Sequence, residues 1–291
     1  MSCAFRPASV LSRVIPAAVA LGLAATTVEA HPSWSIVRDK ARGLVYYSDL
    51  RQVFVINSKL ERRVAVPDVH THELRIDEQG RLFGEDAKVN GRHRVWRLDP
   101  DGRLVDIIPD QAGFRDDWGF VADGAGRLYW AKCQNNAPGG PFCVVKRRAE
   151  EGRIEVAAGG ARFAHPLNFL APATDGAVLV ADGPDVKKIQ DGAAPTVLFS
   201  SLTRAKDRFA IMGFHQETDG AVVAAAFGDG EIVRVTPTGV KSVLAKSPAP
   251  WAPTGVLRTE SGLWILEFDG ARARLRFLDK AGRETAFPVS P

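Results

Sequence analysis

The sequence of 291 residues lacks several motifs on which whole classes of enzyme depend. It has three cysteines and no Cys-x-x-Cys pair, so neither a zinc ribbon nor a thioredoxin-type redox centre is indicated. A Gly-rich phosphate loop, a nucleophile elbow and a His-Glu-x-x-His helix are absent as well. Covalent catalysis therefore has no support in the sequence, and neither do a nucleotide-binding phosphate loop or a zinc-protease helix.

The sequence also lacks long helical patterns and concentrated charge. No segment keeps a helical period of apolar residues for a dozen positions. The formal net charge is only +4, and the basic pairs Arg62-Arg63, Arg147-Arg148 and Lys187-Lys188 are scattered, with no aromatic residues between them. We therefore expect solvated strand faces at these pairs and no nucleic-acid partner.

Residues 1–30 differ in composition from the rest of the chain. Arg6 and Arg13 precede the apolar stretch VIPAAVALGLAATT, and small residues surround Glu29 just before His31. This pattern is typical of a secretory signal cleaved after Ala30. A retained membrane anchor is the alternative, but the apolar stretch falls short of the roughly 20 residues that a bilayer core requires. We expect a periplasmic or secreted protein with no membrane span after cleavage.

Cysteine usage agrees with export. Cys3 belongs to the signal, so the mature chain keeps one pair, Cys133 and Cys143, separated by the Gly/Pro-rich loop QNNAPGGPF. Because exported proteins fold in an oxidising compartment, a disulfide between these two residues is expected. The bond would join the two strands of a hairpin.

One sequence motif occurs six times along the mature chain. It consists of a polar turn that ends in glycine and a short apolar run that follows the turn. Examples are DEQGRLFGED at 77–86 and TESGLWILEF at 259–268. The spacings between successive anchor glycines are 37, 46, 50, 44 and 42 residues. These spacings are close to the length of a four-stranded propeller blade. The anchor glycines are Gly43, Gly80, Gly126, Gly176, Gly220 and Gly262.

A second sequence motif, typical of a strand, a turn and another strand, follows the first. Examples are VWRLDPDGRLVDII at 95–108 and IVRVTPTGVKSVLA at 232–245. Each repeat therefore holds two hairpins, and the alternation of apolar and polar residues favours strands. The sequence predicts an all-β, six-bladed β-propeller with four antiparallel strands per blade. We expect one domain over residues 31–291, closed without an exchanged strand. A β-sandwich is the rival, but it would not require six matched units.

Aspartates recur just after the second strand of most repeats. Such regularity could indicate a ring of carboxylates, but aspartate also accepts backbone hydrogen bonds in tight turns. We favour the turn interpretation. The residues concerned are Asp49, Asp86, Asp182, Asp229 and Asp269.

The repeat resembles the NHL-type and gluconolactonase/strictosidine-synthase-like six-bladed propellers, across almost the whole mature chain. This resemblance implies that functional residues lie on the face where the innermost strands begin. Counting back from the anchor glycines gives a candidate channel mouth. It consists of Ser33 to Ser35, His70 to Glu73, Asp116 to Trp118, His165 to Asn168, Ile211 to Gly213 and Pro253 to Gly255.

The gluconolactonase-like enzymes bind a divalent cation at that mouth through a Glu, two Asn and an Asp from separate blades, since a hard cation requires several oxygens. Asn168 falls in register with one of these asparagines. HPSW, Trp118 and Met212 occupy the other three positions. Asp117, or its neighbour Asp116, could supply an oxygen from a position close to Trp118. The resemblance thus makes Asp117 and Asn168 the candidate ligands for calcium.

His70 and His72 lie two residues apart and so face the same side of one strand. Together with His165 and His215 from other blades they could form a site for zinc. Two alternatives stay open, namely hydrogen bonding to backbone at the strand ends and acid/base catalysis. The candidate substrate-binding residues are His70, Glu73, Trp118, His165 and Trp251, where the tryptophans could line a pocket.

These observations predict an exported propeller that binds a small molecule in its central channel. The chemistry implied by the resemblance is hydrolysis of a lactone or ester, with His72 or a water on a divalent metal as the base. The alternative is a non-catalytic scaffold whose face binds a protein or glycan partner. The departures from the metal-binding pattern motivate this alternative.

Overall fold

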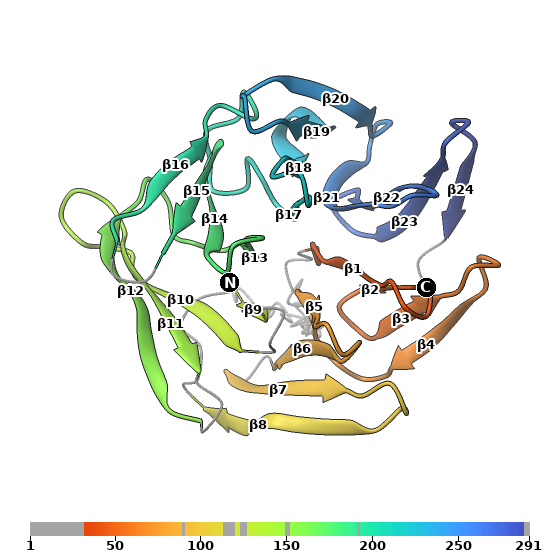
Figure 1. Cartoon of the computed structure of the whole chain (residues 1–291), viewed down its shortest axis with the longest axis horizontal. Helices are drawn as coiled ribbons and strands as arrows, with labels where there is room; N and C mark the ends of the chain where they lie inside the picture. Colours follow the sequence, from red (N-terminus) through yellow and green to blue (C-terminus); the bar gives the residue numbers. More distant parts are fainter. Residues whose placement is uncertain are drawn as a thin grey trace, which may run out of the picture. The chain divides into compact units, whose positions relative to one another are not determined.

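The computed structural model describes residues 32–88, 91–112, 120–122, 127–148, 152–190 and 193–287. Over these ranges the chain forms 24 strands in six four-stranded sheets, which are arranged in a ring (Figure 1). The contacts group residues 31–291 into one unit. None of the described residues belongs to a helix long and apolar enough to cross a membrane. The predicted six-bladed β-propeller is confirmed.

The strands of each blade follow one another along the chain. Blade 1 has β1 (Ile36–Asp39), β2 (Leu44–Ser48), β3 (Val53–Ile56) and β4 (Arg62–Val66). Blade 2 has β5 (Leu74–Ile76), β6 (Leu82–Ala87), β7 (Arg92–Leu98) and β8 (Leu104–Ala112). Blade 3 has β9 (Phe120–Ala122), β10 (Leu128–Gln134), β11 (Phe142–Arg148) and β12 (Ile154–Arg162).

Blades 4 to 6 repeat the same arrangement. Blade 4 has β13 (Leu170–Pro172), β14 (Val178–Asp182), β15 (Asp185–Ile189) and β16 (Thr196–Phe199). Blade 5 has β17 (Phe214–Gln216), β18 (Val222–Ala226), β19 (Glu231–Val235) and β20 (Lys241–Lys246), with the short 3-10 helix η1 (Phe227–Asp229) after β18. Blade 6 has β21 (Ala252–Arg258), β22 (Gly262–Phe268), β23 (Ala273–Asp279) and β24 (Glu284–Phe287).

Apolar side chains hold the blades together through their flat faces. Six clusters of buried residues occur among the described residues, one at each interface between neighbouring blades. At the interface of blades 1 and 6, Tyr47 and Phe54 pack in one cluster with Trp264 and Phe277. The ring therefore closes by side-chain packing between complete blades. No strand is exchanged among the sheets described, as the sequence predicts.

Tight turns between the first and second strands account for the recurring glycines. Gly80 has φ of +72° and Gly176 has φ of +82°, values that a side chain at Cβ disfavours. The N–H of Gly80 donates to the carbonyl of Asp77 at 3.0 Å, which closes the turn. Gly126 lies outside the described residues.

The recurring aspartates accept backbone hydrogen bonds, as predicted. Asp86 accepts from the N–H of His70 at 3.0 Å, and Asp182 accepts from the N–H of His165 at 2.8 Å. In each case a carboxylate at the end of the second strand fixes the connection that leads into the same blade. These aspartates are thus structural, since they position the residues that precede the inner strands.

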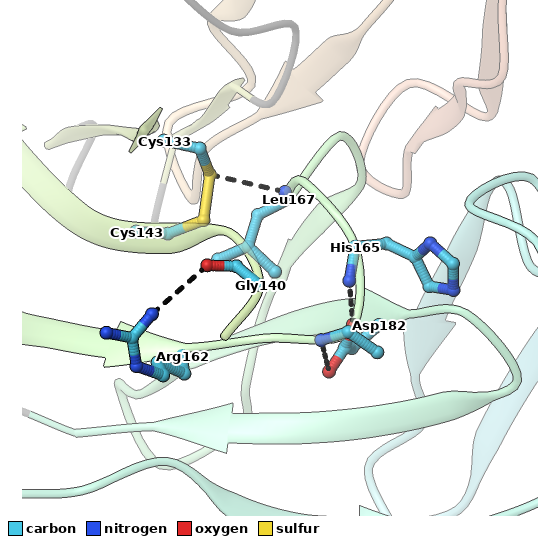
Figure 2. Close-up of a disulfide and its surroundings, with 8 residues drawn as sticks. Cys133, Gly140, Cys143, Arg162, His165, Leu167 and Asp182 are labelled. Carbon is cyan, nitrogen blue, oxygen red and sulfur yellow. Dashed lines mark hydrogen bonds between the residues drawn. A yellow bond between two sulfur atoms is a disulfide. The ribbon is translucent and has the colours of Figure 1, made fainter. Parts of the chain in front are cut away.

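The disulfide predicted between Cys133 and Cys143 is present (Figure 2). The two residues lie directly opposite each other on β10 and β11. The Sγ of Cys133 also accepts a hydrogen bond from the N–H of Leu167 at 3.4 Å. The bond therefore joins the hairpin of blade 3 and contacts the connection into blade 4.

Candidate functional site

A cavity of about 960 Å³ runs along the inner strands β1, β5, β13, β17 and β21. Its volume falls within the range of roughly 300 to 1,000 Å³ that is usual for small-molecule sites. At one end its wall consists of the buried side chains Trp34, Phe169 and Met212. At the other end its wall includes exposed residues in the turns that follow the inner strands, namely Lys40, Glu78, Thr174, Thr218 and Glu260.

Among the described residues, the cavity wall is therefore exposed at the ends of the inner strands, the open end, and buried where those strands begin, the closed end. The channel mouth was predicted at the beginning of the strands. Most of the expected mouth is buried: the exposed fraction is 0% for His72, Glu73 and Thr254, and 4% for Asn168. The described part of the predicted mouth is therefore largely buried.

Trp34 is the centre of this closed end. Its ring stacks on the ring of His72 at a centroid distance of 5.1 Å and meets Phe169 edge-on at 4.9 Å. Gly213 and Gly255 approach the Trp34 carbonyl so closely that an added Cβ would lie 2.1 Å and 2.4 Å from its oxygen. Glycine at both positions therefore lets blades 5 and 6 converge on blade 1.

Arg75 of β5 crosses the cavity wall and bonds to three blades. Its Nη1 donates to Ser35 Oγ at 3.0 Å in the blade 1 segment and to the Leu74 carbonyl at 2.9 Å. Its Nη2 donates to the carboxylate of Glu73 and to the carbonyl of Leu170 in blade 4. Four of the five guanidinium N–H groups are thus engaged, which fixes the orientation of the fifth, on Nε.

His215 of β17 contributes a neutral imidazole to the same cavity. Burial lowers the pKa of His215 to about 4, and the charges of Arg75 and Arg258 add to this effect. Glu217 and a hydrogen bond to the Val256 backbone oppose it. The ring donates its proton to Val256, so Nδ1 is left as an acceptor.

Three residues of the cavity wall each carry a buried nitrogen that has no hydrogen-bond partner. They are Nε1 of Trp34, Nε of Arg75 and Nδ1 of His215. The first two are N–H donors and the third is an acceptor. Leaving a buried polar group unpaired costs about 1 to 3 kcal/mol, so these three nitrogens are candidates for contact with a bound molecule.

Ion pairs tie neighbouring blades together at the open end. Arg38 of blade 1 pairs with Glu260 of blade 6, and Arg258 of blade 6 pairs with Glu217 of blade 5 at 3.0 Å. The Arg38 guanidinium holds the pKa of Glu260 below its usual range. The open end is therefore framed by charged side chains whose positions are set between blades.

The structure brings together part of the predicted histidine cluster. The rings of His70 and His72 lie 4.7 Å apart, but both residues precede β5 and lie in no strand, unlike the predicted placement. His72 is held by Glu85, whose Oε1 lies 3.1 Å from Nδ1 and accepts from the His72 N–H at 2.9 Å. Thr71 fixes the same segment by donating to the Glu85 carbonyl at 2.6 Å. His72 is not among the described residues that line the cavity.

The other predicted residues lie in separate places. His165 Nε2 is 2.7 Å from the carbonyl of Lys206, and Trp251 lies against Arg274, whose guanidinium carbon is 4.2 Å from the ring centroid. Glu73 lines the cavity and is bound to Arg75. Asp117 and Trp118 lie outside the described residues.

The described residues do not fit the metal sites that the resemblance suggested. They contain no group of three His, Cys, Asp or Glu side chains that could hold an ion, so His70, His72, His165 and His215 do not converge. At the family's ligand positions the described side chains are the amide of Asn168, the indole of Trp34 and the thioether of Met212. A hard cation requires more oxygens than this set offers.

Arg75 was not predicted as a site residue, Trp34 was predicted only as part of the channel mouth, and His215 only as a metal ligand. The alternation in HELRI places Glu73 and Arg75 on the same side of the strand. This pattern was the signal in the sequence that could have identified Arg75 as a neighbour of Glu73. Trp34 gave no comparable signal, because its role depends on contacts with blades 2, 4, 5 and 6 that are distant in sequence.

Comparison with solved structures places this architecture among known propellers. Virginiamycin B lyase from Staphylococcus aureus is 15% identical, with a TM-score of 0.55 over 89% of this chain and 85% of that chain. A gluconolactonase from Xanthomonas campestris is 18% identical, with a TM-score of 0.57 over 84% and 86% of the two chains. A chain from a nidogen–laminin complex is 13% identical, with a TM-score of 0.54 over 70% and 75%.

No protein-family model and no curated protein matches the sequence. At such low identities the structural likeness establishes the fold, and the chemistry has to be argued from the residues of the site. The chain is a six-bladed β-propeller of the architecture found in gluconolactonases, virginiamycin B lyase and nidogen-type propellers.

Proposed function

We propose that this protein binds a small polar molecule in the central cavity and that the molecule enters between the turns that follow the inner strands. The observation that carries this proposal is the set of three unpartnered nitrogens around one cavity, on Trp34, Arg75 and His215. A ligand with an acceptor group and a hydroxyl would satisfy them all. Export to the periplasm or medium belongs to the proposal and agrees with the disulfide.

Binding requires some movement of the cavity wall. Each of the three nitrogens is covered from solvent, so a ligand reaches them by displacing a neighbouring side chain. The cavity of about 960 Å³ provides room for such a shift. The rigid part of the site is the Arg75 network, since four bonds from one guanidinium to three blades resist rearrangement.

A second candidate function is hydrolysis of a lactone or ester at the same place. The observation that favours it is the combination of two N–H donors with a neutral imidazole. The N–H groups of Trp34 and Arg75 would stabilise negative charge on the carbonyl oxygen. Nδ1 of His215 would accept a proton from the attacking water. The low pKa of His215 makes it a weak base, so slow turnover is expected.

The experiment is isothermal titration of the mature chain with a panel of lactones, esters and hydroxy acids, using Trp34→Phe as the test variant. This change removes one N–H and keeps an aromatic ring. Loss of one hydrogen bond of about 1 to 1.5 kcal/mol should raise Kd roughly five- to tenfold. Product release from the same lactones and esters is measured in parallel.

Trp264→Phe is the matched control. Trp264 is buried against Phe277 in blade 6 and does not line the cavity, so its replacement should leave Kd unchanged. Equal Kd values for the wild type and Trp34→Phe would refute the cavity site. Absence of any binding across the panel would favour the scaffold alternative, in which a protein or glycan partner binds the surface.

A further inference from the structure

Resting on the proposed function, we infer that the ligand of the central cavity is an organic carboxylate that carries a hydroxyl group, and that Lys40 and Lys280 draw it into the cavity. This assignment names the chemical class of the ligand. It depends on three features of the cavity wall, namely its charge balance, its two buried N–H donors without a partner and the neutral acceptor on His215.

The cavity wall carries more positive than negative charge. Among the described residues its six cations are Arg38, Lys40, Arg75, Arg127, Arg258 and Lys280, and its four anions are Glu73, Glu78, Glu217 and Glu260. The difference, 6 − 4 = +2, favours an anionic occupant. A concave site lined by one excess sign concentrates ligands of the opposite sign.

Most of the carboxylates are already neutralised by cations of the same wall. Glu73 pairs with Arg75, Glu217 with Arg258, and Glu260 with Arg38. None of the ion pairs between described residues involves Lys40 or Lys280. Both lysines are exposed in turns at the open end. There the Lys40 charge helps to lower the pKa of Glu260, and Glu78 forms no ion pair with another described residue of the wall. The two ammonium groups therefore provide the attraction at the opening.

The cavity wall contributes two buried N–H donors, which a ligand reaches when a neighbouring side chain moves, and this number favours a carboxylate over a phosphate. Four N–H groups of Arg75 are engaged, which leaves Nε–H, and Trp34 adds its indole N–H. One donor for each oxygen satisfies a carboxylate. A phosphate would bring three oxygens and a larger charge than these two donors can compensate.

The acceptor on His215 requires a donor from the ligand. Nδ1 is unpartnered while the ring proton is directed to Val256, so a hydroxyl group of the ligand would complete its hydrogen bonding. The groups that face this ring are Arg75, Glu217 and Arg258. A ligand that combines a carboxylate with a hydroxyl therefore satisfies all three nitrogens at once.

The test uses ligand-observed NMR and titration with matched pairs, each consisting of a small hydroxy carboxylate and its primary amide. The pairs include gluconate with gluconamide and 4-hydroxybenzoate with 4-hydroxybenzamide. The acids should bind and their amides should bind at least tenfold more weakly. Because exposed charges are screened by salt, the affinity of the acids should fall as NaCl is raised.

Lys40→Gln and Lys280→Gln should each weaken binding of the acids by about two- to fivefold at low salt, as expected for exposed charge interactions. Lys59→Gln is the matched control, because Lys59 is an exposed lysine in a turn of blade 1 that does not line the cavity. It should leave the affinity unchanged.

The outcomes separate this inference from the proposed function. If amides bind as tightly as acids and Trp34→Phe weakens both, the cavity site stands and the carboxylate assignment is wrong. If the lysine variants and the control lose affinity equally, the role assigned to Lys40 and Lys280 in attracting the ligand is wrong. If neither acids nor amides bind, both the inference and the cavity site are overturned.

Discussion

Arg75 on the inner strand of blade 2 donates a hydrogen bond to the carbonyl of Leu170 on the inner strand of blade 4. Blade 3 lies between blades 2 and 4 in the ring, so the bond links two blades that are not neighbours (Figure 1). One side chain therefore acts both as a structural link and as the carrier of a free donor beside the cavity. Its carboxylate partner, Glu73, is fully buried.

Removal of the Arg75 charge should be costly because the buried Glu73 carboxylate then loses its ion pair with Arg75. We expect Arg75→Met to lower the free energy of unfolding by about 3 to 5 kcal/mol, the usual cost of breaking a buried pair. Glu73→Gln combined with Arg75→Met should cost less than the sum of the single changes. Urea denaturation of the three variants measures the coupling, and additive losses would mean that the two side chains act independently.

Packing inside blade 2 gives a second prediction. A Cβ on Gly84 would lie 2.2 Å from Cζ2 of the buried Trp96. Gly84→Ala should therefore destabilise the fold by about 1 to 3 kcal/mol through overpacking. The smaller ring in Trp96→Phe makes room for the methyl group, so the double variant should recover part of the loss. A Gly84→Ala protein with wild-type stability would contradict the described packing.

The disulfide should contribute to stability without affecting the cavity. Replacing Cys133 and Cys143 by alanine frees a hairpin loop of about ten residues, which should cost roughly 3 kcal/mol through the entropy of the unfolded chain. Neither cysteine lines the cavity, so ligand affinity should stay the same. Thermal unfolding and titration of the double variant test the two statements separately, and a change in Kd at full folding would contradict the second.

His215 should make stability depend on pH. Its pKa of about 4 in the folded protein is below the usual 6.5, so between these values the unfolded chain binds more protons than the folded one. Stability is therefore fully present above about pH 6.5 and is lost as the pH falls toward 4, at up to about 1.4 kcal/mol per unit. His215→Gln should flatten this part of the profile. Equal slopes for both proteins would show that His215 does not titrate in this way.

The fold was predictable because its signals are local and repeated. Turns such as the one at Gly80 require a residue that tolerates positive φ, and strand alternation follows each turn with a fixed period. The pairing of Cys133 with Cys143 was predictable for the same reason, since two cysteines close in sequence flank a hairpin loop.

The site was predicted less well because it depends on contacts between distant residues. Sequence spacing identified where each inner strand begins, but the closing of that end by Trp34, Phe169 and Met212 follows from packing across blades. The role of His72 illustrates the difference. Its ring is held between Trp34 and Glu85, so its environment is set by residues from two blades. Spacing alone does not reveal such neighbours.

The most direct test of the central claim is a crystal structure of the mature protein with the hydroxy carboxylate that binds most tightly. The account predicts that the ligand lies in the central cavity, with its carboxylate in hydrogen-bonding distance of Arg75 Nε and Trp34 Nε1 and its hydroxyl beside His215 Nδ1. A ligand bound instead at the opposite end, against His70 and Trp251, would contradict the account.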